Sequence, residues 1–133
     1  MYKLGLTWGV WDLLHIGHTR LLKSASELCE KLYVGVTTDE YAVIKKGRVP
    51  VIPYDQRTEL LSELPFVAFT FPQSEEYTKA WAVQTYKPDA LFVGDDWTPQ
   101  TYGGEGLGVP VIYLPRTRIT DTTCIIKRIK EFY

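Results

Sequence analysis

The sequence predicts an α/β fold in which a five-stranded parallel sheet carries helices on both faces. Five short apolar segments, rich in β-branched or aromatic side chains, recur at residues 4–8, 32–36, 66–71, 90–93 and 109–114. Helical patterns separate them, and strands that alternate with helices typically form a parallel sheet covered on both sides. With 133 residues, 45% of them hydrophobic, the chain suits a single domain over residues 1–133 with one continuous core.

Composition argues against several classes of protein. The formal net charge of -1 disfavours a protein that binds nucleic acid through bulk positive charge. No leader-like segment follows Met1 and no apolar run approaches the ~20 residues of a membrane span, so we expect no membrane association. The two cysteines, Cys29 and Cys124, are too few for a disulfide scaffold and lack metal-site spacing, which favours a reduced, cytoplasmic setting.

The first predicted strand leads into a corner that carries both histidines of the chain. His15 and His18 stand three residues apart, where the apolar strand gives way to a helical pattern near Gly17. Gly17 lets a ligand approach the backbone, and the free N–H groups of a first helical turn favour an anion. Imidazoles here could donate to phosphate oxygens and stabilise charge growing on phosphorus. A purely structural alternative, with His15 packed under the loop and His18 lining the helix, stays open.

The first predicted helix follows this corner, and three more helices are expected in the middle of the chain. Leu21, Ala25, Leu28 and Leu32 recur at helical spacing and should pack on the sheet. Further helices are expected over residues 41–44, 55–64 and 75–86. Arg57, in the second of these, is either structural or part of a site.

A basic loop is expected over residues 45–53. One glycine, two prolines and the three cations Lys45, Lys46 and Arg48 are typical of an ordered but movable surface loop. The loop is the best candidate for a lid, and a plain solvated turn is the alternative.

Two further corners follow the fourth and fifth predicted strands. Residues 94–97, Gly-Asp-Asp-Trp, stand at the carboxyl end of a strand, where open parallel sheets bind ligands, and one aspartate could hold a hydroxyl, an amino group or a Mg²⁺-bound water. After the last strand, Arg116 can fork onto phosphate oxygens. Thr122 and Thr123 begin the last helix, whose free N–H groups and hydroxyls can hold more phosphates. As an alternative, the two threonines simply cap that helix.

Three stretches resemble the small cytidylyltransferases of the nucleotidylyltransferase superfamily, and most of all the glycerol-3-phosphate cytidylyltransferases. Residues 9–18 are similar to their Gly-Thr-Phe-Asp-x-x-His-x-Gly-His stretch, and residues 94–97 and 114–123 agree in order and spacing. The tetrapeptide His-Ile-Gly-His alone also occurs in class I aminoacyl-tRNA synthetases, but the three stretches together are specific.

The resemblance implies a Rossmann-like nucleotidylyltransferase fold and transfer of CMP from CTP to a small phosphorylated alcohol similar to glycerol 3-phosphate. The products would be a CDP-linked compound for a surface polymer and pyrophosphate. Mg²⁺ would arrive with the nucleotide, without a metal site of the protein alone, and a homodimer is expected. Alternatives within this chemistry are ATP as donor, or phosphocholine, phosphoethanolamine, a sugar or polyol phosphate or a phosphorylated amide as acceptor. An alternative of another class is a nucleotide-sensing module without turnover.

The resemblance also implies roles for individual residues. His15 and His18 would bind the α-phosphoryl group and the departing pyrophosphate, Lys45 would bridge donor and acceptor phosphates, and Arg116 would hold the outer phosphates. The nucleotide would further contact Gly9, Val10, Trp11, Gly17, Asp96, Thr122 and Thr123. The acceptor would contact Asp12, Lys46 and Lys79.

Three positions depart from the family pattern. Val10 stands where the family has threonine, Pro65 where it has arginine, and Asp121 where it has serine. The carboxylate of Asp121 would repel a triphosphate unless it points away or meets Mg²⁺. The departure at Pro65 leaves the acceptor open, and all three departures keep the nucleotide-sensing module as an alternative.

Overall fold

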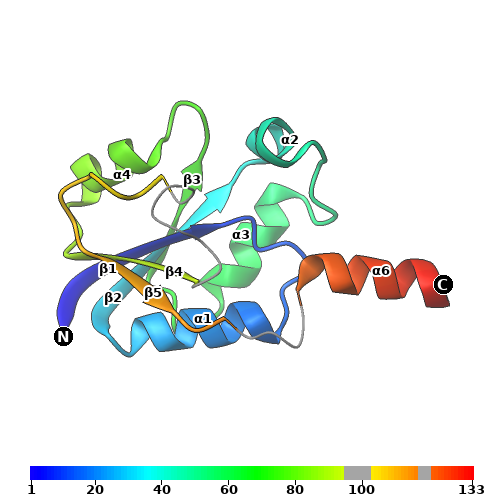
Figure 1. Cartoon of the computed structure of the whole chain (residues 1–133), viewed down its shortest axis with the longest axis horizontal. Helices are drawn as coiled ribbons and strands as arrows, with labels where there is room; N and C mark the ends of the chain where they lie inside the picture. Colours follow the sequence, from blue (N-terminus) through cyan, green and yellow to red (C-terminus); the bar gives the residue numbers. More distant parts are fainter. Residues whose placement is uncertain (95–102, 117–120) are drawn as a thin grey trace.

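The computed structural model describes residues 1–94, 103–116 and 121–133, and in them a five-stranded parallel sheet in the order β3-β2-β1-β4-β5 (Figure 1). The strands are β1 (Tyr2–Gly9), β2 (Cys29–Thr37), β3 (Phe69–Gln73), β4 (Ala90–Gly94) and β5 (Val111–Leu114). The predicted Rossmann-like sheet is therefore confirmed.

Helices cover both faces of the sheet, as predicted. The described helices are α1 (Ile16–Ser26), α2 (Asp39–Lys46), α3 (Tyr54–Ser62), α4 (Lys79–Tyr86) and α6 (Thr122–Phe132). Leu22 of α1, the helix below β1 in Figure 1, and Leu61 of α3 pack into one core cluster with residues of β2 and β4, while Ala82 of α4 joins Leu6 and Phe71 on the opposite face. None of these helices is long and apolar enough to cross a membrane.

The strand order creates one crevice. From central β1 the chain moves outward through β2 and β3, then returns to the other side of β1 with β4 and β5. Neighbouring connections therefore leave the carboxyl ends of β1 and β4 in opposite directions, which is the switch point where open α/β sheets bind ligands. The histidine corner follows β1 directly.

The first helix is shorter than its sequence pattern predicts. It ends at Ser26, and the chain re-enters the sheet at Cys29, so Leu32 belongs to β2 and Leu28 is 40% exposed. Apolar residues of a buried strand happened to continue the helical spacing. Leu22 is fully buried beside Ala25, so it makes the contact with the sheet that was expected of Leu28 and Leu32.

Two other helix boundaries also differ from the sequence prediction. α2 continues through Lys46 and ends at Gly47, whose φ of 75° suits a glycine, so Lys45 and Lys46 occupy a helical turn and not a loop. α4 begins at Lys79, not at residue 75, because the Thr78 hydroxyl accepts from the amide of Trp81 (3.1 Å) and caps the helix there.

Candidate active site

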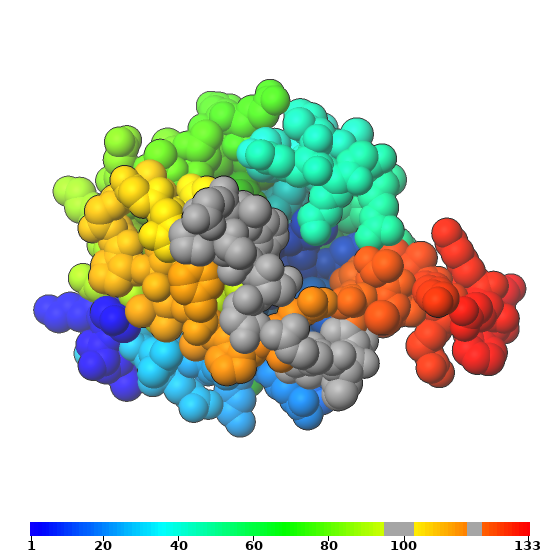
Figure 2. Space-filling view, in the orientation of Figure 1, coloured from blue at the N-terminus to red at the C-terminus, as the bar shows by residue number. Residues whose placement is uncertain are grey.

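A hollow of about 320 Å³ opens at the switch point, where Figure 2 shows the blue segment after β1 deep between the teal loop after α2 and the orange start of α6. Its lining comes from the ends of β1 and β4 and the first turns of α1 and α6. The lining residues are Thr7, Trp8, Gly9, Val10, Trp11, His15, Gly17, His18, Leu21, Lys46, Arg48, Val93, Gly94, Arg116, Asp121, Thr122 and Thr123. The structure thus brings His15, His18, Arg116 and both threonines to one place.

The two histidines cap α1 reciprocally. His15 Nδ1 accepts from the amide of Gly17 (3.1 Å), and the amide of His15 donates to His18 Nδ1 (3.2 Å). The rings stack with centroids 3.7 Å apart. Because each Nδ1 accepts a hydrogen bond, the proton of each neutral ring resides on Nε2. Both imidazoles therefore keep one N–H donor for a ligand.

The histidines are held neutral. Burial lowers the pKa of His18 to about 3, with a smaller effect of the neighbouring His15. Burial also lowers the pKa of His15, where nearby Asp121 opposes the shift and Arg116 adds to it. Near neutral pH both rings offer hydrogen-bond donors without a full charge, so phosphate binding needs no proton uptake by them.

The chain turns sharply between β1 and α1. Trp11 and Leu13 have φ values of 59° and 51°, in the left-handed region that costs a side-chain-bearing residue of order ~1–3 kcal/mol. The indole of Trp11 offsets this cost, because it is 5% exposed and donates to the carbonyl of Gly35 (3.0 Å). Trp11 thus lines the hollow while its ring is anchored in the core.

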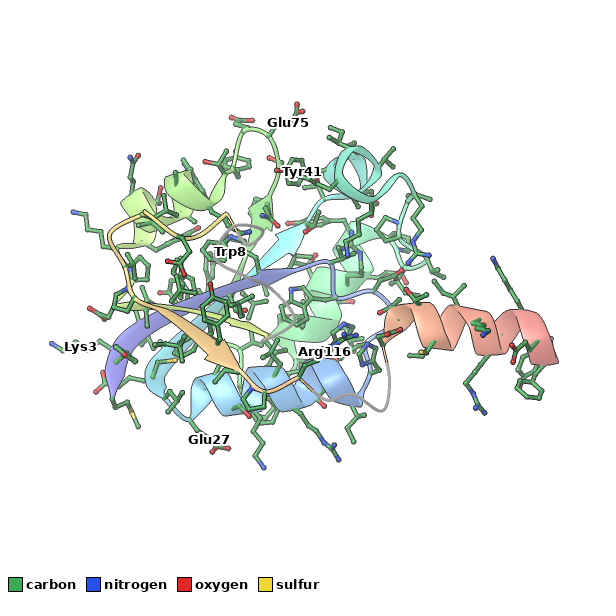
Figure 3. The ribbon with its side chains drawn as sticks, viewed as in Figure 1. Lys3, Trp8, Glu27, Tyr41, Glu75 and Arg116 are labelled. Carbon is green, nitrogen blue, oxygen red and sulfur yellow. The ribbon has the colours of Figure 1, made fainter. Side chains whose placement is uncertain are left out.

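The second corner lies at the start of α6. Asp121 caps the helix by accepting from the amide of Cys124 (2.7 Å), and its other carboxylate oxygen accepts from Arg116 (3.1 Å). These partners, the Cys124 amide foremost, hold the pKa of Asp121 below its usual value. Figure 3 shows Arg116 beside α1 and the start of α6. The two oxygens of the Asp121 carboxylate thus face the Cys124 amide and Arg116, and these two donors partly neutralise the charge that was expected to repel a triphosphate.

One hydrogen bond joins the two corners. The Thr122 hydroxyl donates to the carbonyl of Asp12 (2.9 Å), a residue 110 positions earlier in the chain. Thr122 therefore fixes the first turn of α6 against the loop after β1.

Asp12, for which the resemblance implied contact with the acceptor, lines a small hollow of about 140 Å³ with His18 and Lys46 and also binds the loop after α2. Its side chain is buried, and its two carboxylate oxygens accept from the amides of Val51 (2.8 Å) and Ile52 (2.9 Å). Both oxygens are thus engaged with the loop after α2. The geometry makes Asp12 the residue that attaches this loop to the histidine corner.

Arg57, for which the sequence left open a structural role or a place in the site, has a structural role. It is 1% exposed and donates to the carbonyls of Val10 (2.6 Å), Thr37 (2.9 Å) and Ile52 (2.8 Å), and it pairs with Asp39 (2.7 Å). One guanidinium therefore ties the ends of β1 and β2, the basic loop and α2 together. Its position within a helix of mostly polar residues carried no signal of this role.

A second hollow, of about 390 Å³, lies on the other side of the end of β1; we call it the lysine hollow. Its lining residues are Trp8, Gly9, Val10, Thr37, Tyr41, Ala42, Lys45, Lys46, Gln73, Lys79 and Val93. Trp8, Gly9, Val10, Lys46 and Val93 also line the first hollow. Ligands in the two hollows would therefore meet across the end of β1.

Lys79 is more enclosed than a solvated surface lysine. Its Nζ lies 5.8 Å from the ring centre of Trp8, and burial together with the charge of Lys45 lowers the pKa of Lys79 to about 8. Lys45 and Lys46, predicted for the site, line the same hollow. The structure thus gathers the three lysines from two helices.

Three remaining points concern Asp96 and Trp97, Arg48, and possible metal ligands. Asp96 and Trp97 lie outside the described residues. Arg48, left open by the sequence, lines the first hollow. Among residues 1–94, 103–116 and 121–133, no group of three or more His, Cys, Asp or Glu side chains is arranged to hold a metal ion.

Comparisons with known proteins identify relatives of this chain. The family model described as Cytidylyltransferase-like matches residues 6–124. The chain is 32% identical to glycerol-3-phosphate cytidylyltransferase of Bacillus subtilis over 96% of its own length and 97% of that protein. It is 34% identical to FAD synthase of Pyrococcus abyssi over 94% and 90%. A solved lipopolysaccharide core biosynthesis protein of Thermoplasma volcanium has a TM-score of 0.71 at 26% identity, covering 90% of this chain and 100% of that one.

Proposed function

The chain belongs to the cytidylyltransferase-like family, and on this premise we propose that it transfers CMP from CTP to a small phosphorylated alcohol resembling glycerol 3-phosphate. The observation that carries the proposal is the first hollow, where two helix starts, two imidazole N–H donors and Arg116 converge. Glycerol-3-phosphate cytidylyltransferases of Bacillus and Staphylococcus among the relatives support the choice of CTP and of this acceptor.

The proposed reaction is an in-line displacement at the α-phosphorus. An oxygen of the acceptor phosphate forms the new P–O bond while the bond to pyrophosphate breaks. The acceptor oxygen is already anionic near neutral pH, so the step needs no general base. The protein's contribution is to position two anions and to stabilise the charge that grows on the phosphoryl oxygens.

The first hollow suits the triphosphate. The Nε2–H groups of His15 and His18 would donate to oxygens of the α-phosphate and the departing pyrophosphate. Arg116, the hydroxyl of Thr123 and the free amides of the first turn of α6 would hold the outer phosphates. Arg116 would then exchange part of its contact with Asp121 for the nucleotide.

Mg²⁺ is proposed to be carried by the nucleotide. Asp121 is the acidic side chain that lines the first hollow in the described part of the chain, and its oxygens are used by Cys124 and Arg116. This donor set suits a metal ion held chiefly by phosphate oxygens. When bound, the ion would neutralise charge on the triphosphate.

The lysine hollow suits the acceptor phosphate. Lys45 and Lys79 would neutralise that phosphate, and Lys46, which lines both hollows, would lie between donor and acceptor. Asp12 would act through the loop that it holds and not by touching the acceptor.

A homodimer in the cytoplasm is part of the proposal. Ile129 and Phe132 of α6 are 45% and 66% exposed, and α6 extends away from the sheet (Figure 1), so apolar surface is available for association. Sedimentation equilibrium would test it, since a monomer at micromolar concentration would contradict the dimer.

Pyrophosphate release tests the proposed function. We expect release with CTP, Mg²⁺ and glycerol 3-phosphate, and a fall in kcat of about 10²–10³-fold in His18→Ala, the size expected for loss of a preorganised donor. The FAD synthase relatives favour one second candidate, adenylyl transfer from ATP to FMN, so that pair belongs in the assay. Tight nucleotide binding without release on any acceptor would instead indicate a nucleotide-sensing module.

A further inference from the structure

Helix α6 lacks the packing that supports the other helices. It extends away from the sheet (Figure 1), and none of its residues, all of which the structure describes, is buried. A helix of 11 residues is marginal in water by itself, because most helical stability in proteins comes from packing of an apolar face. We therefore expect α6 to be stabilised by a surface beyond those that its own chain supplies.

One face of α6 suits such packing. Its larger apolar residues recur at helical spacing and share this face, which we call the α6 stripe: Ile125, Ile126, Ile129 and Phe132. At 3.6 residues per turn, Arg128 and Lys130 fall at the two edges of the stripe. The helix thus presents an apolar stripe with basic edges.

A hollow of about 680 Å³ opens between α3 and the first turns of α6; we call it the α3–α6 groove. Its apolar lining residues are Leu13, Leu14, Ile52, Leu60 and Ile125. In the described part of the chain its charged lining residues are Glu59 and Glu63, and both are exposed. The groove therefore combines apolar surface with negative charge, which complements the α6 stripe and its basic edges.

We propose that the α3–α6 groove binds α6 of a second copy of this chain. Ile125 belongs to both the groove and the stripe, so apolar surface continues from one to the other. In a twofold dimer each copy would insert its own α6 and offer its own groove, as a self-complementary interface requires. The inference rests on the homodimer of the proposed function and names its interface.

An antiparallel arrangement of the two α6 helices satisfies this symmetry. Phe132 lies roughly 10 Å along the helix from Ile125, so it would reach the partner's groove while the two Ile129 side chains pack together near the twofold axis. The cations at the edges of the stripe would then approach the partner's Glu59 and Glu63.

Matched substitutions within α6 test the inference. Ile129→Glu places a charge in the stripe, whereas Lys127→Glu places the same side chain on the opposite face of the helix. By sedimentation equilibrium at micromolar concentration we expect dimers for the wild type and Lys127→Glu. For Ile129→Glu the dissociation constant of the dimer should rise by about 100-fold or more, because the substitution enters the interface twice.

Charge reversal tests the groove itself. Glu59→Lys combined with Glu63→Lys should weaken the dimer, because the groove would then repel the basic edges of the partner's α6. Adding Arg128→Glu and Lys130→Glu should restore it, since the attraction is re-formed with the signs exchanged. Circular dichroism would confirm that the variants remain folded, as expected for exposed positions.

A dimer that Ile129→Glu leaves intact, or one that the combined charge reversal fails to restore, would overturn the inference and leave the proposed homodimer standing. A monomeric wild type would overturn both. Pyrophosphate release by the wild type is measured separately, so neither result bears on the proposed nucleotidyl transfer.

Discussion

At the scale of single residues, the same side-chain atoms that stabilise the backbone also prepare the site. The Nδ1 atoms of His15 and His18 satisfy two amides at the start of α1, and this use directs the protonated Nε2 atoms to a ligand. Burial keeps the rings neutral. The structural and functional alternatives that the sequence left open for these histidines are therefore compatible.

The lowered pKa of His18 predicts how stability depends on pH. In the unfolded chain the imidazole takes up a proton near pH 6.5, whereas in the folded protein it does so only near pH 3. Between these values the unfolded state binds more protons, so stability should fall as pH falls, by up to about 1.4 kcal/mol per pH unit. Urea unfolding of the wild type and of His18→Gln at pH 7 and pH 5 would measure this. An equal loss of stability in both proteins would contradict it.

At the scale of elements, the site depends on connections between segments that lie far apart in the chain. Arg57 of α3 bonds the carbonyls at the ends of β1 and β2, and Asp12 bonds the loop after α2. At the other corner, Asp121 caps α6 and Thr122 anchors it. The elements that carry the groups proposed to bind phosphate are thus fixed by polar contacts at their ends.

Arg57→Met should destabilise the protein by about 3–5 kcal/mol, the cost of breaking a buried ion pair and its hydrogen bonds. The substitution leaves three carbonyls and Asp39 without their partner. Thermal and urea unfolding would measure the loss, with the exposed Arg20→Met as the matched control. A loss no larger than that of the control would show that Arg57 is not the link described.

Asp121 caps α6 and places a negative charge beside Arg116, and two substitutions separate these roles. Asp121→Ser keeps an oxygen that can accept from the Cys124 amide, so α6 should remain capped, whereas Asp121→Ala should cost about 1 kcal/mol. Both remove the negative charge beside Arg116, and CTP affinity should rise several-fold in Asp121→Ser. Calorimetric titration with CTP and hydrogen exchange of the α6 amides would measure the two effects. Weaker CTP binding in Asp121→Ser would mean that the carboxylate assists the nucleotide.

At the scale of the whole molecule, the order of the strands decides where the chemistry can occur. The corner at residues 9–18 follows β1, whereas Arg116 and residues 121–123 follow β5, the strand on the far side of β4, and the two sets line one hollow. The two hollows share a wall at the end of β1. The proposed donor and acceptor would therefore meet at the switch point of the sheet.

Saturating CTP should stabilise the whole domain, by ~2.7 kcal/mol at 100 times its dissociation constant. If one triphosphate spans both corners, His18→Ala and Arg116→Ala should each weaken binding by about 10–100-fold, the effect of losing hydrogen bonds to a charged group. Thermal shift with CTP would report this, and Lys23→Ala should retain the full shift. Loss of the shift in only one of the two site variants would show that the corners do not share a ligand.

Local signals in the sequence accounted for the sheet, for most of its helices and for the two helix starts at which phosphate binding is proposed. Short apolar runs mark buried strands, and His15 and Gly17 interact within one turn, which a linear pattern records. Where a helical spacing ran on into a strand, as at Leu32, or where Thr78 supplied a late cap, the local pattern misplaced the boundary.

The roles of Asp12, Arg57 and Lys79 were decided only by the tertiary structure. Asp12 bonds amides 39 and 40 residues away, Arg57 reaches a carbonyl 47 residues away, and Lys79 acquires its lowered pKa from burial beside Trp8 and Lys45. Such partners are fixed by the sheet's register and not by neighbours in the chain. The sequence by itself therefore determined where the two helix starts proposed to bind phosphate lie in the chain, and the packing of distant elements decided which charges surround them.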